Sequence, residues 1–168
     1  MIIRQASVED IRLIAHLYVS SHKTTYKGLV SDDYLNNLTP EKASERWKDY
    51  LSDVKNRMWV ACEENELLGF VASMPDSTSD KIWYLDSLHI CHEARGKGIG
   101  TALIRTAGEY ALGNGYDKMS VCVVKGNEKA KKLYLKLGAR HLLSFEDKFA
   151  NSRVNSEKLL WDDLKIFE

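Results

Sequence analysis

Alternating and clustered apolar positions predict a short strand followed by helices in the first third of the chain. The strand is expected over "MIIRQA", and Ile11, Ile14, Ala15 and Tyr18 then recur at helical spacing. Ser7, followed three residues later by Asp10, is typical of a capping box, so a helix should begin there. The pattern therefore opens with a strand and then a helix.

Cap residues and turn residues subdivide the polar segment that follows. Gly28 predicts a turn, Ser31 a helix cap, and Thr39 with Pro40 the cap and first residue of a further helix. This segment is expected to be helical and polar on one side.

Apolar runs in the middle of the chain predict a group of strands. "RMWVAC" and "LLGFVASM" flank "EENE" as in a hairpin, and "KIWYLDSLHI" adds a third strand. After a glycine-rich turn, apolar positions keep helical spacing from Ile99 to Tyr110, and Gly113 to Gly115 should end that helix.

In the last part of the chain, predicted strands and a helix again follow one another. "MSVCVV" predicts a strand, a second helix runs from Asn127 to Gly138, and "HLLSFEDKF" and "EKLLWDDL" supply two closing strands. The expected fold is α/β, with mixed α and β elements around one central sheet. With 168 residues and 44% hydrophobic content, residues 1–168 are expected to form a single domain.

Composition narrows the functional classes. Lys plus Arg and Asp plus Glu number 24 each, so no global field attracts nucleic acid or an anionic membrane. No apolar run reaches the roughly 20 residues that span a bilayer, and the start lacks a signal-peptide pattern, so a cytoplasmic protein is expected. The cysteines, Cys62, Cys91 and Cys122, are odd in number and are expected to be reduced. The five histidines show no metal-ligand spacing, and no metal is predicted.

The stretch "YLDSLHICHEARGKGIGTALI" places glycines at alternate positions between a strand and a helix. A helix N-terminus offers unpaired N–H groups and a positive dipole end, which suit a phosphate. Without a Cβ at Gly96, Gly98 and Gly100, the backbone can approach a pyrophosphate, and Arg95 and Lys97 add positive charge. A flexible basic turn is the alternative. The glycine spacing differs from the dinucleotide fingerprint, and no Lys-Ser/Thr follows as in a P-loop.

These residues resemble the acetyl-CoA signature of the GNAT superfamily of N-acetyltransferases. "ICHEARGKGIGTAL" fits its R/Q-x-x-G-x-G/A pattern, with Arg95, Gly98 and Gly100 in the fixed positions. "NEKAKKLYLKLGA" resembles a later family motif and contains Asn127 and Tyr134. The resemblance implies a mostly antiparallel, twisted sheet of about six to seven strands flanked by helices, with the cofactor at a splayed strand pair. It also implies acetyl-CoA as co-substrate.

The same resemblance implies roles for individual residues. The pantetheine arm of acetyl-CoA would lie along the strand at Leu88, His89 and Ile90. Asn127 would hydrogen-bond the arm from the other side. The pyrophosphate would be held by the turn, whose residues are Arg95, Gly96, Lys97, Gly98, Ile99, Gly100 and Thr101.

Tyr134 is the expected acid. A thiol has a pKa of about 8.5 and a tyrosine about 10, so a tyrosine near the sulfur can donate a proton as the thiolate leaves. The alternative is a core tyrosine on an apolar helix face.

Asp86 is the candidate base for the acceptor ammonium. Strand alternation predicts that it shares a face with Tyr84, Leu88 and Ile90, although a bulge would change this. A structural aspartate is the alternative. Many relatives carry a glutamate near here, and the position expected for it is Tyr84, so a water chain is a second proton route.

Tyr26 and Tyr34 are predicted to line the acceptor pocket, although helix packing explains them equally well. The expected reaction is acetyl transfer to a primary amine of a small molecule or peptide by direct attack in a ternary complex. The rival hypotheses are a non-catalytic acyl-CoA-binding or regulatory module and a subunit that acts mainly through association. A homodimer formed by exchange of the C-terminal strands is a further hypothesis.

Overall fold

The computed structural model describes residues 1–168, and seven strands form one sheet in the order β1-β2-β3-β4-β5-β7-β6. All neighbouring strands run antiparallel except β4 and β5, which are parallel. The prediction of a mostly antiparallel sheet of six to seven strands flanked by helices is confirmed. The strands are β1 (Ile2–Gln5), β2 (Arg57–Glu63), β3 (Glu66–Pro75), β4 (Ile82–Ile90), β5 (Lys118–Val124), β6 (Arg140–Phe149) and β7 (Ser152–Trp161).

The helices begin where the cap residues predict. Ser7 and Asp10 form a capping box on a 3₁₀ turn that leads directly into α1. The Ser31 hydroxyl accepts a hydrogen bond from the N–H of Tyr34 at 3.3 Å, and Thr39 caps α3 in the same way. The helices are α1 (Ile11–Thr25), α2 (Asp32–Asn37), α3 (Pro40–Ser52), α4 (Ile99–Gly113) and α5 (Glu128–Lys136), with 3₁₀ turns η1 (Val8–Asp10), η2 (His92–Ala94) and η3 (Leu164–Phe167).

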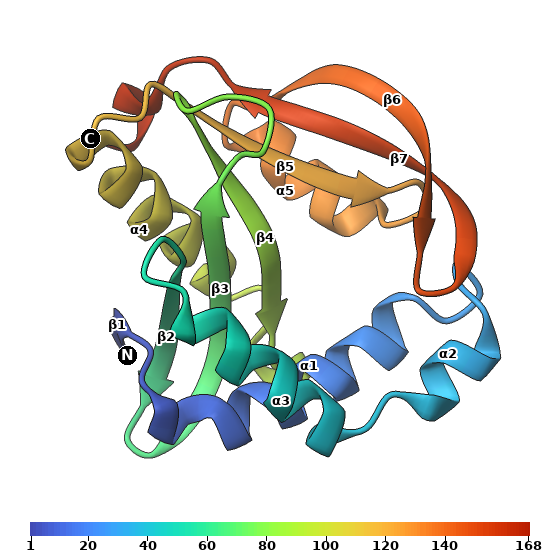
Figure 1. The fold of residues 1–168 in the computed structure, drawn as a ribbon. Helices are drawn as coiled ribbons and strands as arrows, with labels where there is room; N and C mark the ends of the chain where they lie inside the picture. Colours follow the sequence, from blue (N-terminus) through green and yellow to red (C-terminus); the bar gives the residue numbers. More distant parts are fainter.

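Two apolar layers hold the helices to opposite faces of the sheet (Figure 1). On one face, α1 and α3 pack on strands β2 and β3, and Trp47 of α3 is fully buried there with Phe70. On the other face, α4 and α5 cover β4, β5 and β7, with Leu103 and Tyr134 in the same cluster as Leu85. Each of these four helices therefore buries its apolar side against the strands, and the sheet separates the two layers.

The C-terminal strands are longer than the sequence pattern predicts. β7 begins at Ser152, before the predicted "EKLLWDDL", because it pairs with β5 on one side and β6 on the other. β6 is one of the two edge strands, and its outer edge has no partner in this chain. Exchange of these strands in a homodimer stays a prediction.

Strands β4 and β5 pair over only part of their length. Ile82 to Leu85 face Lys118 to Val121, but β4 continues to Ile90 and β5 to Val124 without further pairing. Figure 1 shows the two strands diverging. Where β4 and β5 separate, the facing edges of the two strands have unpaired backbone groups at the centre of the molecule, between the two helical layers.

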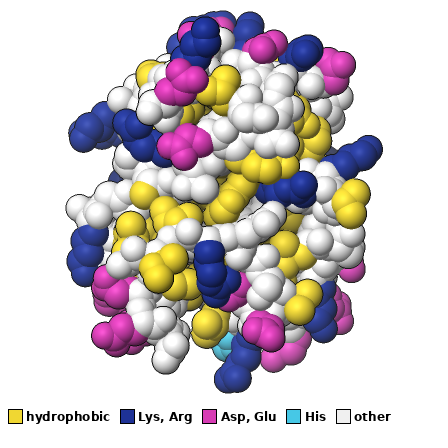
Figure 2. Space-filling model, turned by 90° about the vertical axis from the view of Figure 1, so that its left-hand side faces the viewer, with side chains coloured by type: hydrophobic (Ala, Val, Ile, Leu, Met, Phe, Trp, Pro, Cys, Tyr) yellow, Lys and Arg dark blue, Asp and Glu magenta, His cyan; other side chains and the backbone are white.

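Surface charge shows no large region of one sign on the face in Figure 2, where basic and acidic side chains are interspersed. This distribution agrees with the equal numbers of acidic and basic residues. None of the helices is both long and apolar enough to span a bilayer.

Candidate active site

A cavity of about 1180 Å³ occupies the space between the diverging ends of β4 and β5. Its walls come from α1, β4, the glycine turn with α4, β5, α5 and the end of β6, so most of the chain contributes to it. All but one of the predicted site residues line it: Tyr26, Tyr34, Asp86, Leu88, His89, Ile90, Arg95, Gly96, Gly98, Ile99, Gly100, Thr101, Asn127 and Tyr134. The exception is Lys97, which is exposed and lies outside the lining.

The glycine turn presents free N–H groups at the start of α4. Gly96 and Gly98 have φ of 76° and 79°, in the left-handed region that a Cβ disfavours. Backbone pairing resumes at Ala102, which donates to the Gly98 carbonyl, and no backbone carbonyl accepts from the N–H groups of Gly96 to Thr101. Such a row of donors, with the positive end of the helix dipole, fits a pyrophosphate.

Gly100 has a different role from the other two glycines. A Cβ built there would lie 3.3 Å from Leu133 of α5, whereas a Cβ on Gly96 or Gly98 would meet nothing within 4 Å. Gly96 and Gly98 therefore allow the shape of the turn, and Gly100 allows α4 to pack closely on α5. The expectation that all three glycines admit a pyrophosphate stays a prediction, and packing on α5 is an additional reason for Gly100.

A β-bulge in β4 changes the facing predicted for Asp86. Ala72 pairs with Ser87 and Ser73 with Leu85, so Asp86 is the extra residue. Leu88 and Ile90 pack in the layer of α4, whereas Asp86 lies within 3.6 Å of Arg46 on α3. The predicted shared face of Asp86 with Leu88 and Ile90 is therefore wrong, because the bulge shifts the alternation by one residue.

Asp86 is a partly buried carboxylate beside one cation. Burial raises the pKa of Asp86, and the Arg46 guanidinium acts in the opposite direction without cancelling this effect. The Arg46 Nη2 to Asp86 Oδ2 distance is 3.6 Å, longer than a good charge-assisted hydrogen bond. A carboxylate with a raised pKa is a better base near neutral pH than an exposed one.

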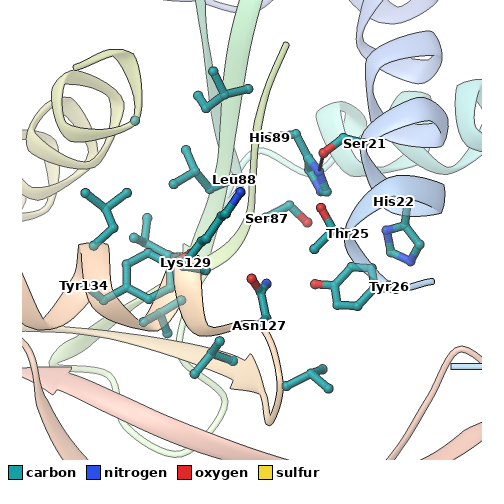
Figure 3. A pocket seen from close by; sticks show the side chains of 18 of the residues that line it. Ser21, His22, Thr25, Tyr26, Ser87, Leu88, His89, Asn127, Lys129 and Tyr134 are labelled. Carbon is teal, nitrogen blue, oxygen red and sulfur yellow. Dashed lines mark hydrogen bonds between the residues drawn. The ribbon is translucent and has the colours of Figure 1, made fainter. Parts of the chain in front are cut away.

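Tyr134 lies on α5 with its hydroxyl directed to the cavity (Figure 3). Its ring packs edge-on against Trp161, and its hydroxyl makes no hydrogen bond within the chain. Burial raises the pKa of Tyr134, so the phenol is neutral at pH 7 and able to donate. Asn127, the N-cap residue of α5, lies between Tyr134 and Tyr26 in the same view.

The His89 side chain points away from the predicted cofactor path. Its Nδ1 lies 2.9 Å from the Ser21 hydroxyl, and its ring stacks on Phe70 in the layer of α1. Burial lowers the pKa of His89 to about 3, so it is neutral. Only the main chain of His89 is therefore suited to pair with an extended pantetheine arm, as the neighbouring edge of β4 is unpaired.

The cavity is also lined by residues that sequence reasoning missed, namely His22, Arg46 and Phe149. His22 is buried, neither of its ring nitrogens has a hydrogen-bond partner, and burial lowers its pKa to about 4. Its ring is 4.6 Å from that of Tyr26 and 5.6 Å from that of Phe149, between centroids. The four-residue spacing of Tyr18 and His22 in α1 and of Tyr26, its C-cap residue, was a signal that these side chains share a face.

Comparisons with known proteins identify relatives of this chain. The model of the Acetyltransferase (GNAT) family matches residues 24–139. An uncharacterized N-acetyltransferase of Bacillus subtilis, YuaI, is 28% identical over 99% of this chain and 95% of its own length. An uncharacterized N-acetyltransferase of Archaeoglobus fulgidus is 31% identical over 80% of this chain and 89% of its own length.

The fold is also found among solved structures. Spermidine N-acetyltransferase from Vibrio cholerae, in complex with CoA and spermine, has a TM-score of 0.76 at 20% identity, covering 99% of this chain and 98% of the other. The family match spans most of the chain and includes the glycine turn and α5. The chain belongs to the GNAT acetyltransferase family, whose members transfer an acetyl group from acetyl-CoA.

Proposed function

We propose that this acetyltransferase acetylates a primary amine of a small molecule or peptide by direct attack of the amine in a ternary complex. The observation that carries the proposal is that one cavity joins the free N–H groups of the turn, the Tyr134 hydroxyl and the Asp86 carboxylate. The amine-bound neighbour from Vibrio cholerae supports an amine acceptor.

The residues of the turn would bind and orient acetyl-CoA. The N–H groups from Gly96 to Thr101, together with Arg95, would hold the pyrophosphate, and the unpaired edge of β4 would bind the pantetheine arm. These contacts would fix the thioester at the bulge near Asp86. The fixed geometry favours attack by a second substrate bound in the same cavity.

Two side chains on opposite sides of the thioester, Asp86 and Tyr134, would transfer the protons. An alkylammonium has a pKa of about 10, so Asp86, directly or through water, would take its proton before attack. The nitrogen then bonds to the acetyl carbon, the carbon–sulfur bond breaks, and Tyr134 would donate a proton to the departing thiolate. The excess proton on the acylated nitrogen would pass, directly or through water, to the Tyr134 phenolate, which restores the phenol and leaves the neutral amide. The products are an N-acetyl amide and CoA.

Thiol release in the presence of acetyl-CoA and a panel of amines tests the function. The panel contains amino acids, polyamines, aminoglycosides and peptides, and each amine is assayed against a reaction without acceptor. Amine-dependent thiol release with a stoichiometric N-acetyl product supports the proposal. Binding of acetyl-CoA without amine-dependent release from any member would instead favour a non-catalytic acyl-CoA-binding module.

A further inference from the structure

Arg46 is a cation at the acceptor side of the cavity that the proposed transfer reaction does not use. It extends from α3 over the rings of Tyr18 and Trp47, with its Cζ 5.6 and 5.0 Å from their centroids. This stacking fixes the guanidinium, although the exposed fraction of the Arg46 side chain is 51%. It lines the cavity and makes no hydrogen bond to another residue.

The donors of Arg46 are therefore positioned but unused. A guanidinium carries five N–H donors in a planar fork that matches a carboxylate. The closest carboxylate oxygen, on Asp86, lies at 3.6 Å and does not satisfy them. Arg46 also lies on the opposite face of the sheet from α4 and α5, the helices beside the predicted cofactor path. Acetyl-CoA phosphates bound at the turn would thus leave the guanidinium free for the acceptor.

Arg46 and Asp86 together present a cation and an anion side by side. We propose that the acceptor is a free α-amino acid, whose carboxylate binds Arg46 while its ammonium group lies at Asp86. The proposal rests on the acetyltransferase function above and names its substrate class. An α-amino acid carries its ammonium and carboxylate groups on the same carbon atom, so its two charges lie close together, as this pair requires.

The surrounding rings indicate which amino acids fit. Tyr26, Tyr34 and Phe149 line the same cavity, and the neutral His22 packs against all three rings. Such a wall favours an uncharged apolar or aromatic side chain over a charged one. A polyamine is disfavoured, because its additional ammonium groups would meet the Arg46 guanidinium with like charge.

Matched pairs of acceptors test the role of the carboxylate. The pairs are L-phenylalanine with phenethylamine, L-leucine with 3-methylbutylamine, and L-methionine with 3-(methylsulfanyl)propylamine, each assayed by CoA thiol release. L-phenylalaninamide is added because it lacks the carboxylate but has a less basic amine than phenethylamine. We expect kcat/KM to be about 10- to 100-fold higher for an amino acid than for its amine or amide.

Substitutions at Arg46 test whether this residue causes the preference. Arg46→Gln should reduce the amino acid to amine ratio of kcat/KM to about one, and Arg46→Lys should restore part of it. The ratio within one variant cancels changes in folded fraction and in the basicity of Asp86. Lys48→Gln, on the same helix but exposed and outside the cavity, removes one positive charge and should keep the wild-type ratio.

Several outcomes overturn the proposal while leaving the acetyltransferase function intact. These are equal or better turnover of the decarboxylated amines, a preference that survives Arg46→Gln, or turnover of polyamines but of no amino acid. Absence of thiol release with every amine, although acetyl-CoA binds, would overturn both this proposal and the proposed function.

Discussion

The Tyr134 hydroxyl combines two properties that a proton donor needs at this site. Burial raises its pKa, so it keeps its proton at neutral pH, and it has no partner within the chain that would hold it away from a substrate. A buried tyrosine that served only packing would be expected to satisfy its hydroxyl with a protein partner. Its contact with the cavity therefore favours a chemical role over a structural one.

Replacement of Tyr134 by Phe should separate these roles. The ring contact with Trp161 is kept and only the hydroxyl is lost. We expect kcat to fall about 100-fold, as for removal of a general acid, with the Kd for acetyl-CoA and the melting temperature almost unchanged. Steady-state kinetics, calorimetric titration and thermal unfolding measure the three quantities. Unchanged kcat, with chemistry shown to be rate-limiting in a single-turnover assay, would return Tyr134 to a packing role.

Asp86→Asn tests the proposed base, and the raised pKa of Asp86 predicts the direction in which this substitution changes the stability of the fold. Because the folded-state pKa of Asp86 is raised, its ionisation costs folding free energy once the pH exceeds its unfolded-state pKa of about 4, increasingly up to the folded value. Asn avoids this cost, so the variant should not be less stable at pH 7. Turnover should nevertheless fall, with part of the rate recovered at higher pH as more acceptor amine becomes neutral.

Thermal unfolding and a pH–rate profile, measured with the same acceptor, distinguish the two roles of Asp86. A lower melting temperature with an unshifted profile would identify Asp86 as a structural residue. A water chain would then remain as the proton route.

Residue roles were predictable only where a motif or a cap fixes local geometry. Ser31 and Thr39 cap their helices as expected, because an N-cap depends on the next three residues alone. Asp86 was misplaced because its facing depends on a bulge opposite Ala72 and Ser73 of another strand. Arg46 carried no sequence signal, since its proposed role depends on Asp86, which is distant in sequence, and on the cavity.

At the scale of elements, the turn before α4 is the part of the site that local sequence determines most completely. Two positive φ angles and a helix N-terminus produce the row of free N–H groups, and all of these follow from the glycine positions. The divergence of β4 and β5 could not be predicted in the same way. It depends on where pairing stops between strands separated by a whole helix.

The turn allows a matched comparison of charge. A substitution at Gly98 strains the backbone whatever binds there, because its φ is 79°, so side-chain charge is the cleaner probe. Arg95 lines the cavity and Lys97 does not. Arg95→Gln should weaken acetyl-CoA binding about tenfold and reduce its salt dependence, whereas Lys97→Gln should change Kd less than about twofold. Equal effects of the two variants would contradict the placement of the pyrophosphate beside Arg95.

At the scale of the whole molecule, a buried ionic network joins strands on both sides of the diverging pair. Asp76, just after β3, accepts hydrogen bonds from the Lys158 ammonium of β7 at 2.7 Å, from Ser120 of β5 at 2.7 Å and from Thr78 at 2.6 Å. The side chains of Asp76 and Lys158 retain only 3% and 14% of their exposure. The network therefore holds β3, β5 and β7 in place next to the point where the cavity opens.

Asp76→Asn should destabilise the protein, by an amount that depends on pH. Burial acts to raise the pKa of Asp76, but hydrogen bonds from Lys158, Thr78 and Ser120 outweigh it and hold the pKa well below its usual range. Its ionised form therefore stabilises the fold above the unfolded-state pKa of about 4, and this contribution is lost as the pH falls toward the lowered folded-state value.

At pH 7 the Asp76→Asn variant leaves Lys158 buried without its counter-charge, and we expect a loss of about 3 kcal/mol in the free energy of unfolding. Urea unfolding at pH 7, 5 and 3 should show a difference from the wild type that is similar at the two higher values and smaller at pH 3. Glu146→Gln is the matched control, because Glu146 pairs with Arg153 at the surface, where the exposed fractions of the two side chains are 63% and 78%. This variant should change the free energy of unfolding by less than about 1 kcal/mol. If the two variants were equally stable, Asp76 and Lys158 would not be what holds these strands together, and the geometry of the cavity would depend on the apolar layers alone.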